Sequence, residues 1–124
     1  MTDLLDLAAE LVDIPSESHE EGPLADLFER RLRDASKLLV DRIGDNVVAR
    51  SDLGREHRIV IAGHLDTVPA NGNQQAVIDG DRLYGLGACD MKGGLAAQLA
   101  TAIAIDEPEV DVTFVFYACE EVAA

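Results

Sequence analysis

The sequence of 124 residues is poor in basic residues and in aromatic residues, and it contains no tryptophan. Ten Lys and Arg stand against 24 Asp and Glu, which gives a formal net charge of −14. Proteins that bind nucleic acid need Lys and Arg to neutralise phosphates, so this balance argues against a nucleic-acid partner. It fits a soluble protein that binds cations, although a solvated acidic surface is the commoner reason for such a charge.

The sequence also has no long apolar run and no basic leader. No stretch approaches the roughly 20 apolar residues that span a bilayer, so a membrane partner is not expected. The first six residues are acidic from Asp3 onward and lack the basic segment of a secretory signal. We therefore expect a cytoplasmic location.

Cysteine is scarce. Cys89 and Cys119 are too few for the disulfide framework of a secreted scaffold. They also lack the Cys-x-x-Cys spacing of a zinc knuckle, although ligation by either sulfur stays open. Each stands directly before an acidic residue of interest, and we expect both to be reduced thiols packed behind a functional site.

Hydrophobic residues make up 48% of the chain, which is enough for a real core. Their spacing alternates between helical and strand periods, which predicts an α/β fold. Helices are predicted over residues 2–12, 24–34 and 95–105. Strands are predicted over residues 37–41, 46–50, 58–63 and 111–119, with a surface hairpin around residues 77–84.

Three short acidic motifs follow a predicted strand or lie in a glycine-rich loop. His64-Leu65-Asp66 follows strand 58–63, and Glu120-Glu121 follows strand 111–119. Asp90 lies in the glycine-rich loop 85–94. The carboxyl ends of neighbouring strands in an open α/β sheet meet at one crevice, so we expect these side chains to gather there. Histidine and carboxylates together are typical ligands of a divalent metal.

The spacing within each motif suggests how its residues would act. Residues i and i+2 of an extended segment point the same way, so Asp66 can hydrogen-bond one imidazole nitrogen of His64 while the other faces a metal. Asp90 could bridge two cations. Adjacent glutamates at a strand end point in different directions, so one of Glu120 and Glu121 can bind metal while the other handles a proton.

Each motif, taken alone, can also be explained by an ordinary structural role with no part in a functional site. A His-x-Asp pair can be part of an ordinary turn, Asp90 can be a helix cap, and a Glu-Glu pair is usually solvated. A nucleotide-binding module is the weaker alternative, because Gly85-x-Gly87-x-x-Asp90 lacks the third glycine of the dinucleotide fingerprint. Lys92 is followed by glycine rather than by the Ser or Thr of a Walker loop, and we expect it to be a structural or surface cation. His19 and His57 lie in polar surroundings and receive no role.

Taken together and in order, the motifs resemble those of the M20 family of dinuclear zinc amidohydrolases. The resemblance is carried by GHLDTVP at residues 63–69, GLGACDMKGG at residues 85–94 and Glu120-Glu121. It implies the N-terminal half of a zinc-exopeptidase-like catalytic domain, with a mixed sheet flanked by helices. Residues 1–124 would then be a truncated part of that domain, with the C-terminal catalytic part and the lid or dimerisation domain absent.

The resemblance also implies a role for each site residue. His64 would be a ligand of one zinc ion and Glu121 a ligand of the other, with Asp90 bridging both. Asp66 would be the catalytic partner of His64, and Glu120 the general base. A complete site would hold two Zn²⁺, for which Co²⁺ or Mn²⁺ could substitute. The resemblance further implies a cis peptide bond between Asp90 and Met91.

The activity implied by the resemblance is metal-dependent hydrolysis of a small-molecule N-acyl amino acid, by a full-length enzyme that is a homodimer. Two Zn²⁺ bring four positive charges, and Asp90 and Glu121 balance only two of them. We therefore expect weak metal binding and little catalysis from residues 1–124 alone. Two alternatives stay open: an acetylornithine deacetylase-like or aminoacylase-like hydrolase of the same family, and a non-catalytic, truncated metal-binding fragment.

Overall fold

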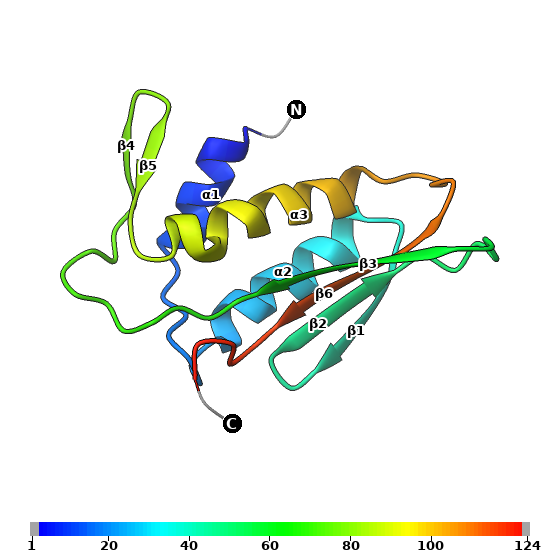
Figure 1. The fold of residues 1–124 in the computed structure, drawn as a ribbon, viewed down its shortest axis with the longest axis horizontal. Coiled ribbons are helices and arrows are strands. Elements are labelled where there is room, and N and C mark those ends of the chain that lie inside the picture. The colour runs from blue at the N-terminus through cyan, green and yellow to red at the C-terminus, as the bar shows by residue number, and fades with distance from the viewer. Residues whose placement is uncertain (1–2, 123–124) are drawn as a thin grey trace.

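The computed structural model describes residues 3–122 of the chain. Three α-helices, one π-helical turn (η1) and six strands follow one another within these residues (Figure 1). In chain order they are α1 (Leu4–Val12), α2 (Gly22–Ala35), β1 (Leu39–Ile43), β2 (Asn46–Arg50), β3 (Arg58–His64), β4 (Val77–Asp79), β5 (Arg82–Tyr84), η1 (Ala88–Lys92), α3 (Gly93–Ala104) and β6 (Asp111–Tyr117).

Four of the strands form one mixed sheet in the order β1-β2-β6-β3. β3 and β6 are parallel, whereas β1 with β2 and β2 with β6 are antiparallel. The parallel register pairs Arg58 with Asp111 at one end and His64 with Tyr117 at the other. β3 and β6 therefore end at the same level, and the segments that follow them leave the sheet side by side.

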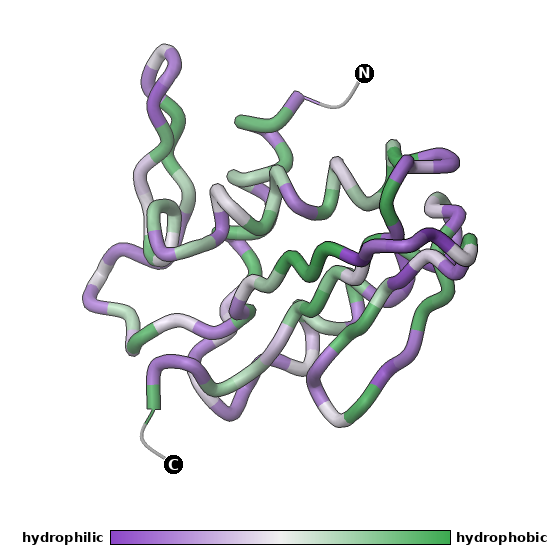
Figure 2. Tube along the Cα trace, turned by 45° about the vertical axis from the view of Figure 1, so that its right-hand side comes forward, coloured by the Kyte–Doolittle hydropathy of each residue, from purple (hydrophilic) through white to green (hydrophobic). Residues whose placement is uncertain are grey.

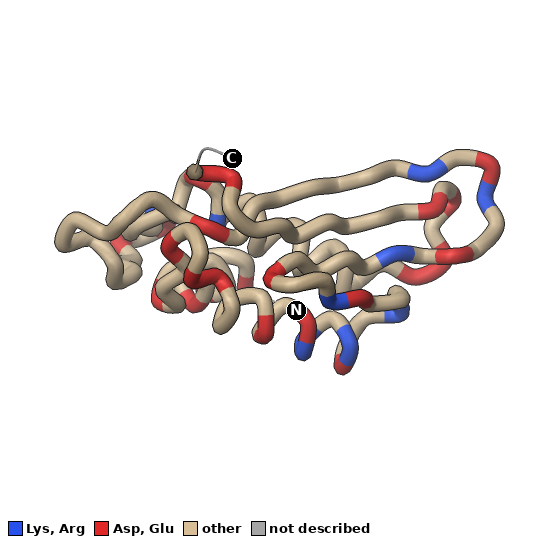
Figure 3. Tube along the Cα trace, turned by 90° about the horizontal axis from the view of Figure 1, so that it is seen from below, with Lys and Arg blue, Asp and Glu red and all other residues tan. Residues whose placement is uncertain are grey.

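The helices lie on one side of this sheet, as Figures 1 and 3 both show. The sheet face toward them is apolar, and hydrophobic residues run along the middle of the strands (Figure 2). Phe28 of α2 packs against Phe116 of β6 with ring centroids 4.8 Å apart, and both side chains are fully buried. The predicted mixed sheet with flanking helices is confirmed.

Local sequence signals explain where the helices begin. The Asp3 carboxylate accepts hydrogen bonds from the amides of Leu5 (2.9 Å) and Asp6 (3.3 Å), which caps α1. The predicted start of this helix at residue 2 lies outside the described residues. Pro23 occupies the first turn of α2, where its missing N–H costs nothing.

The third helix differs from its prediction, since it spans residues 93–104 rather than 95–105. The low helix propensity of the Gly93-Gly94 pair argued for a later start. In the structure η1 runs directly into α3, and a Cβ at Gly93 would lie only 2.8 Å from the Ala88 carbonyl oxygen. Close packing of the two turns therefore outweighs propensity here.

Two strands begin or end at other residues than predicted. The first strand spans residues 39–43 instead of 37–41, because Leu39 to Ile43 pair with β2. The last strand stops at Tyr117 rather than at residue 119, and the next amide, of Ala118, bonds to the Asn46 side chain (2.9 Å). The predicted hairpin is present as β4 and β5. In the described part of the chain, no helix has the length and apolar character needed to cross a membrane.

Candidate metal centre

The three acidic motifs meet at the carboxyl ends of β3 and β6. His64 is the last residue of β3, Asp90 lies in η1, and Glu120 and Glu121 lie in the turn after β6. The Nε2 atom of His64 is 2.9 Å from Asp90 Oδ1, 3.8 Å from Glu121 Oε1 and 3.9 Å from Glu120 Oε2. Residues far apart in the sequence therefore place three carboxylates around one imidazole nitrogen.

The other ring nitrogen of His64 is held by the backbone. Its Nδ1 lies 2.9 Å from the main-chain carbonyl oxygen of Asp66, whereas the Asp66 carboxylate is 3.4 Å away. The prediction that the Asp66 side chain bonds this nitrogen is therefore wrong in detail. When Nδ1 donates to the carbonyl, Nε2 is the nitrogen left to face the three carboxylates.

The surroundings of His64 raise its pKa. Burial by itself lowers the pKa of His64, but the contacts with Asp90 and with the Asp66 carbonyl outweigh it and raise the pKa above its usual value. A positive charge is thus stabilised at the point where the carboxylates converge.

Asp66 organises the turn that carries the two glutamates. Its carboxylate is buried and accepts hydrogen bonds from the Ser18 hydroxyl (2.6 Å) and from the amides of Glu120 and Glu121 (3.0 Å each). Burial raises the pKa of Asp66, but these three bonds lower it more, so the pKa lies below its ordinary value. Asp66 is therefore an ionised acceptor that fixes the backbone beside the site.

The site carries an excess of negative charge. Burial raises the pKa of Glu121, and repulsion from Asp90 and Glu120 raises it further. Among residues 3–122, no Lys or Arg forms an ion pair with Asp90, Glu120 or Glu121. Most Lys and Arg residues lie at the end of the molecule away from the C-terminal turn (Figure 3). Such an excess of negative charge attracts cations.

The donor set fits a divalent metal. One ligand atom each from His64, Glu120 and Glu121 lies within 4.8 Å of the others. One imidazole nitrogen with carboxylate oxygens is a combination that zinc, cobalt and manganese accept. The roles of these residues as metal ligands and as base stay predictions, but the structure brings all five predicted site residues into one place.

The glycine-rich loop carries Asp90 into the site by close packing. Gly87 has a φ of 76°, in the left-handed region, and a Cβ there would lie 2.7 Å from Thr67 Cγ2. The peptide bond between Asp90 and Met91 is cis, as the resemblance implied. A cavity of about 210 Å³ opens beside this loop, lined among others by Asp90 and Glu121.

Lys92 is a structural cation rather than a surface one. Its side chain is 1% exposed, and Nζ donates to the carbonyls of Leu11 (2.8 Å) and Ile14 (2.7 Å). Burial lowers the pKa of Lys92 to about 8. These two hydrogen bonds tie the end of α1 to η1.

The two cysteines behave differently. Both are free thiols, but Cys89 is exposed, so the expectation that both pack behind the site is wrong for it. Cys119 is partly buried, with its sulfur 3.4 Å from Glu21 Oε2 and 3.5 Å from His19 Nδ1. The sequence carried no sign of the roles of Ser18, which bonds to the Asp66 carboxylate, and Glu21, which accepts from the Cys119 amide. Both lie in a polar loop before a helix, and such a loop carries no signal of its distant partners.

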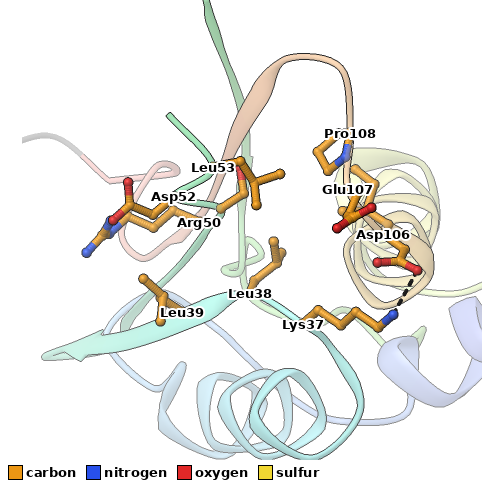
Figure 4. A pocket seen from close by; sticks show the side chains of 11 residues that line it. Lys37, Leu38, Leu39, Arg50, Asp52, Leu53, Asp106, Glu107 and Pro108 are labelled. Atoms are coloured by element: carbon orange, nitrogen blue, oxygen red, sulfur yellow. Dashed lines mark ion pairs between the residues drawn. The ribbon is translucent and has the colours of Figure 1, made fainter. Parts of the chain in front are cut away.

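A larger cavity, of about 440 Å³, lies at the opposite end of the sheet (Figure 4). Lys37 and Asp106 pair across its rim at 2.8 Å, and Leu38 and Leu53 line it. It contains none of the predicted site residues and neither His nor Cys. The candidate centre is therefore the cluster around His64.

Known proteins resemble this chain in sequence. The family model described as peptidase family M20/M25/M40 matches residues 60–124. A protein of Mycobacterium tuberculosis, provisionally named succinyl-diaminopimelate desuccinylase DapE, is 48% identical over 97% of this chain and 34% of its own length. Succinyl-diaminopimelate desuccinylase of Corynebacterium glutamicum is 42% identical over 94% of this chain and 33% of its own length. The chain thus spans about a third of the length of these relatives.

Solved structures share the fold. The M20 family metallo-carboxypeptidase Sso-CP2 of Sulfolobus solfataricus superposes with a TM-score of 0.78 at 21% identity, over 95% of this chain and 31% of that one. The YXEP protein of Bacillus subtilis, described as a dinuclear metal binding peptidase, has a TM-score of 0.67 at 19% identity, over 98% and 36% of the two chains. The matched family model, the relatives and the shared fold lead to one conclusion: this chain belongs to peptidase family M20/M25/M40.

Proposed function

We propose that the protein carrying this chain is a metal-dependent hydrolase of N-acyl amides, and specifically a succinyl-diaminopimelate desuccinylase. It would release succinate and LL-2,6-diaminopimelate from the N-succinyl compound. The observation that carries the proposal is the convergence of Asp90, Glu120 and Glu121 on Nε2 of His64, in a chain of the M20 family. The two desuccinylase relatives support the choice of substrate.

The residues of the site would divide the work. His64, Asp90 and Glu121 would hold the metal, which we propose to be a pair of Zn²⁺ ions with Co²⁺ or Mn²⁺ as substitutes. When bound, the ions would supply Lewis-acid polarisation of the amide carbonyl. The Glu120 side chain is 46% exposed, so it can reach a water and a substrate. It would take the proton of the attacking water and pass it to the departing amine.

We further propose that this chain forms the N-terminal part of the catalytic domain. The carboxylates of Asp90 and Glu121 balance only half the charge of two divalent ions, so further ligands would come from elsewhere in the enzyme. A homodimeric assembly and a small-molecule acyl amino acid substrate belong to the same proposal.

Replacement of Glu120 by glutamine tests the assignment of the base. Glu120→Gln keeps the shape of the side chain but removes its ability to accept a proton. In the protein that carries this segment, we expect the metal content to stay unchanged and kcat to fall by about 10²–10⁴-fold. Metal analysis together with an assay of succinate release measures both quantities.

Glu109→Gln is the matched control, since Glu109 is exposed near the opposite end of β6 and should change neither quantity. A kcat near that of the unchanged protein in Glu120→Gln would refute the assignment of Glu120 as base. Comparing succinylated with acetylated substrates separates the desuccinylase from the acetylornithine deacetylase-like or aminoacylase-like alternatives. Absence of both metal binding and turnover would favour the non-catalytic alternative.

A further inference from the structure

Glu21 is a buried carboxylate that the proposed reaction does not use. Its side chain is fully buried, and it directly precedes α2. Its Oε2 accepts a hydrogen bond from the amide of Cys119 at 2.8 Å. Its Oε1 has no hydrogen-bond partner among the described residues. Burying a carboxylate costs free energy of folding. We therefore expect a buried carboxylate at this position to have a role in holding the group that it contacts.

The group that Glu21 contacts is the turn that bears the two glutamates of the metal centre. Asp66 accepts hydrogen bonds from the amides of Glu120 and Glu121, and Glu21 accepts one from the amide just before them. Two buried carboxylates from distant parts of the chain therefore hold three consecutive amides. Each carboxylate adds charge-assisted hydrogen bonds, which are the strong ones.

The backbone of this turn needs such support. Cys119 has a φ of 62°, in the left-handed region that non-glycine residues seldom adopt. A left-handed residue within a turn points successive amides in one direction and creates a small anion-binding concavity. Such a conformation persists where the surroundings determine it, and Glu21 and Asp66 supply those surroundings.

The position of Glu21 suits a negative charge. It lies at the N-terminus of the 14-residue helix α2, where the helix dipole favours an anion. Among residues 3–122, no Lys or Arg pairs with it in a salt bridge. The helix end and the Cys119 amide are therefore the groups that offset its charge.

We propose that Glu21 is a positioning residue for the metal centre. By holding the amide of Cys119 in the left-handed turn, it sets the direction in which the carboxylates of Glu120 and Glu121 leave the backbone toward His64. Replacing a residue that orients the metal ligands without contacting the metal typically lowers metal affinity by about 10–100-fold. This inference rests on the proposed function, because it needs a metal bound at that cluster.

The test compares Glu21→Ala and Glu21→Gln with the unchanged protein, all made in the full protein that carries this chain. In the metal-free proteins, we expect hydrogen exchange at the amides of residues 119–121 to be at least about tenfold faster in Glu21→Ala, because a charge-assisted hydrogen bond is lost. Glu21→Gln keeps an oxygen acceptor and should show a smaller increase. This second variant also covers the case in which the alanine protein does not fold.

The second measurement is metal binding. We expect Zn²⁺ affinity, from competition with a chromophoric chelator, to fall by about 10–100-fold in Glu21→Ala and less in Glu21→Gln. The visible absorption spectrum of bound Co²⁺ should change in shape, which a purely structural role would not produce.

Asp111→Asn is the matched control. Asp111 is also a buried carboxylate that accepts backbone amides, those of Leu53 and Arg55, but it lies at the other end of β6. This control should lose stability while keeping its Zn²⁺ affinity and Co²⁺ spectrum.

Unchanged amide exchange in both Glu21 variants would overturn the inference. Faster exchange with unchanged affinity and spectrum would also overturn it, since the turn would then not control the ligands. Failure of the unchanged protein to bind metal would sink the proposed function and the metal-positioning role with it. The exchange data would in that case still decide whether Glu21 holds the turn.

Discussion

At the scale of single residues, the site is defined by which atom of each side chain meets which partner. Asp66 uses its main-chain carbonyl for His64 and its carboxylate for Ser18 and for two amides. One residue thus orients the imidazole and the glutamate turn together. Replacing the Asp66 carboxylate would disturb the turn as well as the imidazole ring. The effects of substitutions at Asp66 and at His64 on stability are therefore not expected to be additive.

Asp111 offers a residue-scale prediction about pH. Hydrogen bonds from Ser51 and from the amides of Leu53 and Arg55, assisted by the charge of Arg58, lower the pKa of Asp111 from 3.8 to about 2. Because the folded protein holds this proton more weakly, the contribution of Asp111 to stability is complete above pH 3.8. It is lost as the pH falls through about 2.

We therefore expect Asp111→Asn to lower the Tm at neutral pH. The gap in Tm between this variant and the unchanged protein should narrow as the pH falls from 3.8 toward 2. Thermal unfolding of both proteins across this range measures the gap. A gap of constant size throughout would contradict the assigned role of Asp111.

At the scale of elements, the site depends on how closely α3 approaches β3. Gln98 of α3 donates from Nε2 to the Ala62 carbonyl of β3 at 3.2 Å. Lys92, just before α3, anchors the end of α1 through two carbonyls. These contacts place η1, and with it Asp90, over the end of β3. The position of Asp90 therefore depends on helix packing as well as on the close packing of its own loop.

Gly63→Ala tests this close approach. A Cβ at Gly63 would lie 2.5 Å from Gln98 Oε1 and 2.9 Å from Cδ2 of the fully buried Leu95. We expect overpacking to destabilise the protein by about 1–3 kcal/mol, measured by urea unfolding. The residue adjoins His64, so metal affinity should fall as well.

Gly22→Ala is the control for this change. A Cβ there would meet only Asp45 Oδ1, at an ordinary 3.8 Å, and Gly22 begins α2 with no need for a positive φ. Alanine should be neutral or stabilise the protein by about 0.4–1 kcal/mol. Equal stability of the Gly63 and Gly22 variants would show that α3 and β3 have room to move apart.

At the scale of the whole molecule, charge is distributed unevenly. The chain carries a net charge of −14, and most of its Lys and Arg lie away from the candidate centre (Figure 3). The carboxylates of the candidate centre therefore receive little charge compensation from Lys or Arg within the described residues. A bound cation would relieve repulsion at this centre and would link metal binding to the stability of the whole fold.

We accordingly expect Zn²⁺ to raise the Tm of the full protein that carries this chain, and a chelator to reverse the effect. A ligand at 100 times its Kd adds about 2.7 kcal/mol to the stability of the folded state. Measuring the Tm with Zn²⁺, and again with NaCl at the same ionic strength, distinguishes zinc binding from general screening of the carboxylate charges by salt. An equal rise in Tm with NaCl alone would argue against a specific metal centre.

The sequence by itself determined the kind and order of the α-helices and strands and supplied the candidate residues of the site. Helical and strand periods, the caps and the turn residues act within a few positions, so α1, α2, β2, β3 and the hairpin could be predicted from local patterns. The three acidic motifs were visible for the same reason, since each is a short run after a strand or in a glycine-rich loop.

The tertiary structure alone decided which atoms of these residues meet, and which further residues support them. The register of β3 with β6 sets His64 level with Tyr117 and so brings the glutamate turn to the imidazole. The same folding carries Glu21 to the amide of Cys119, 98 positions away in the chain. Such contacts depend on the packing of all the elements together, and no local pattern in the sequence encodes them.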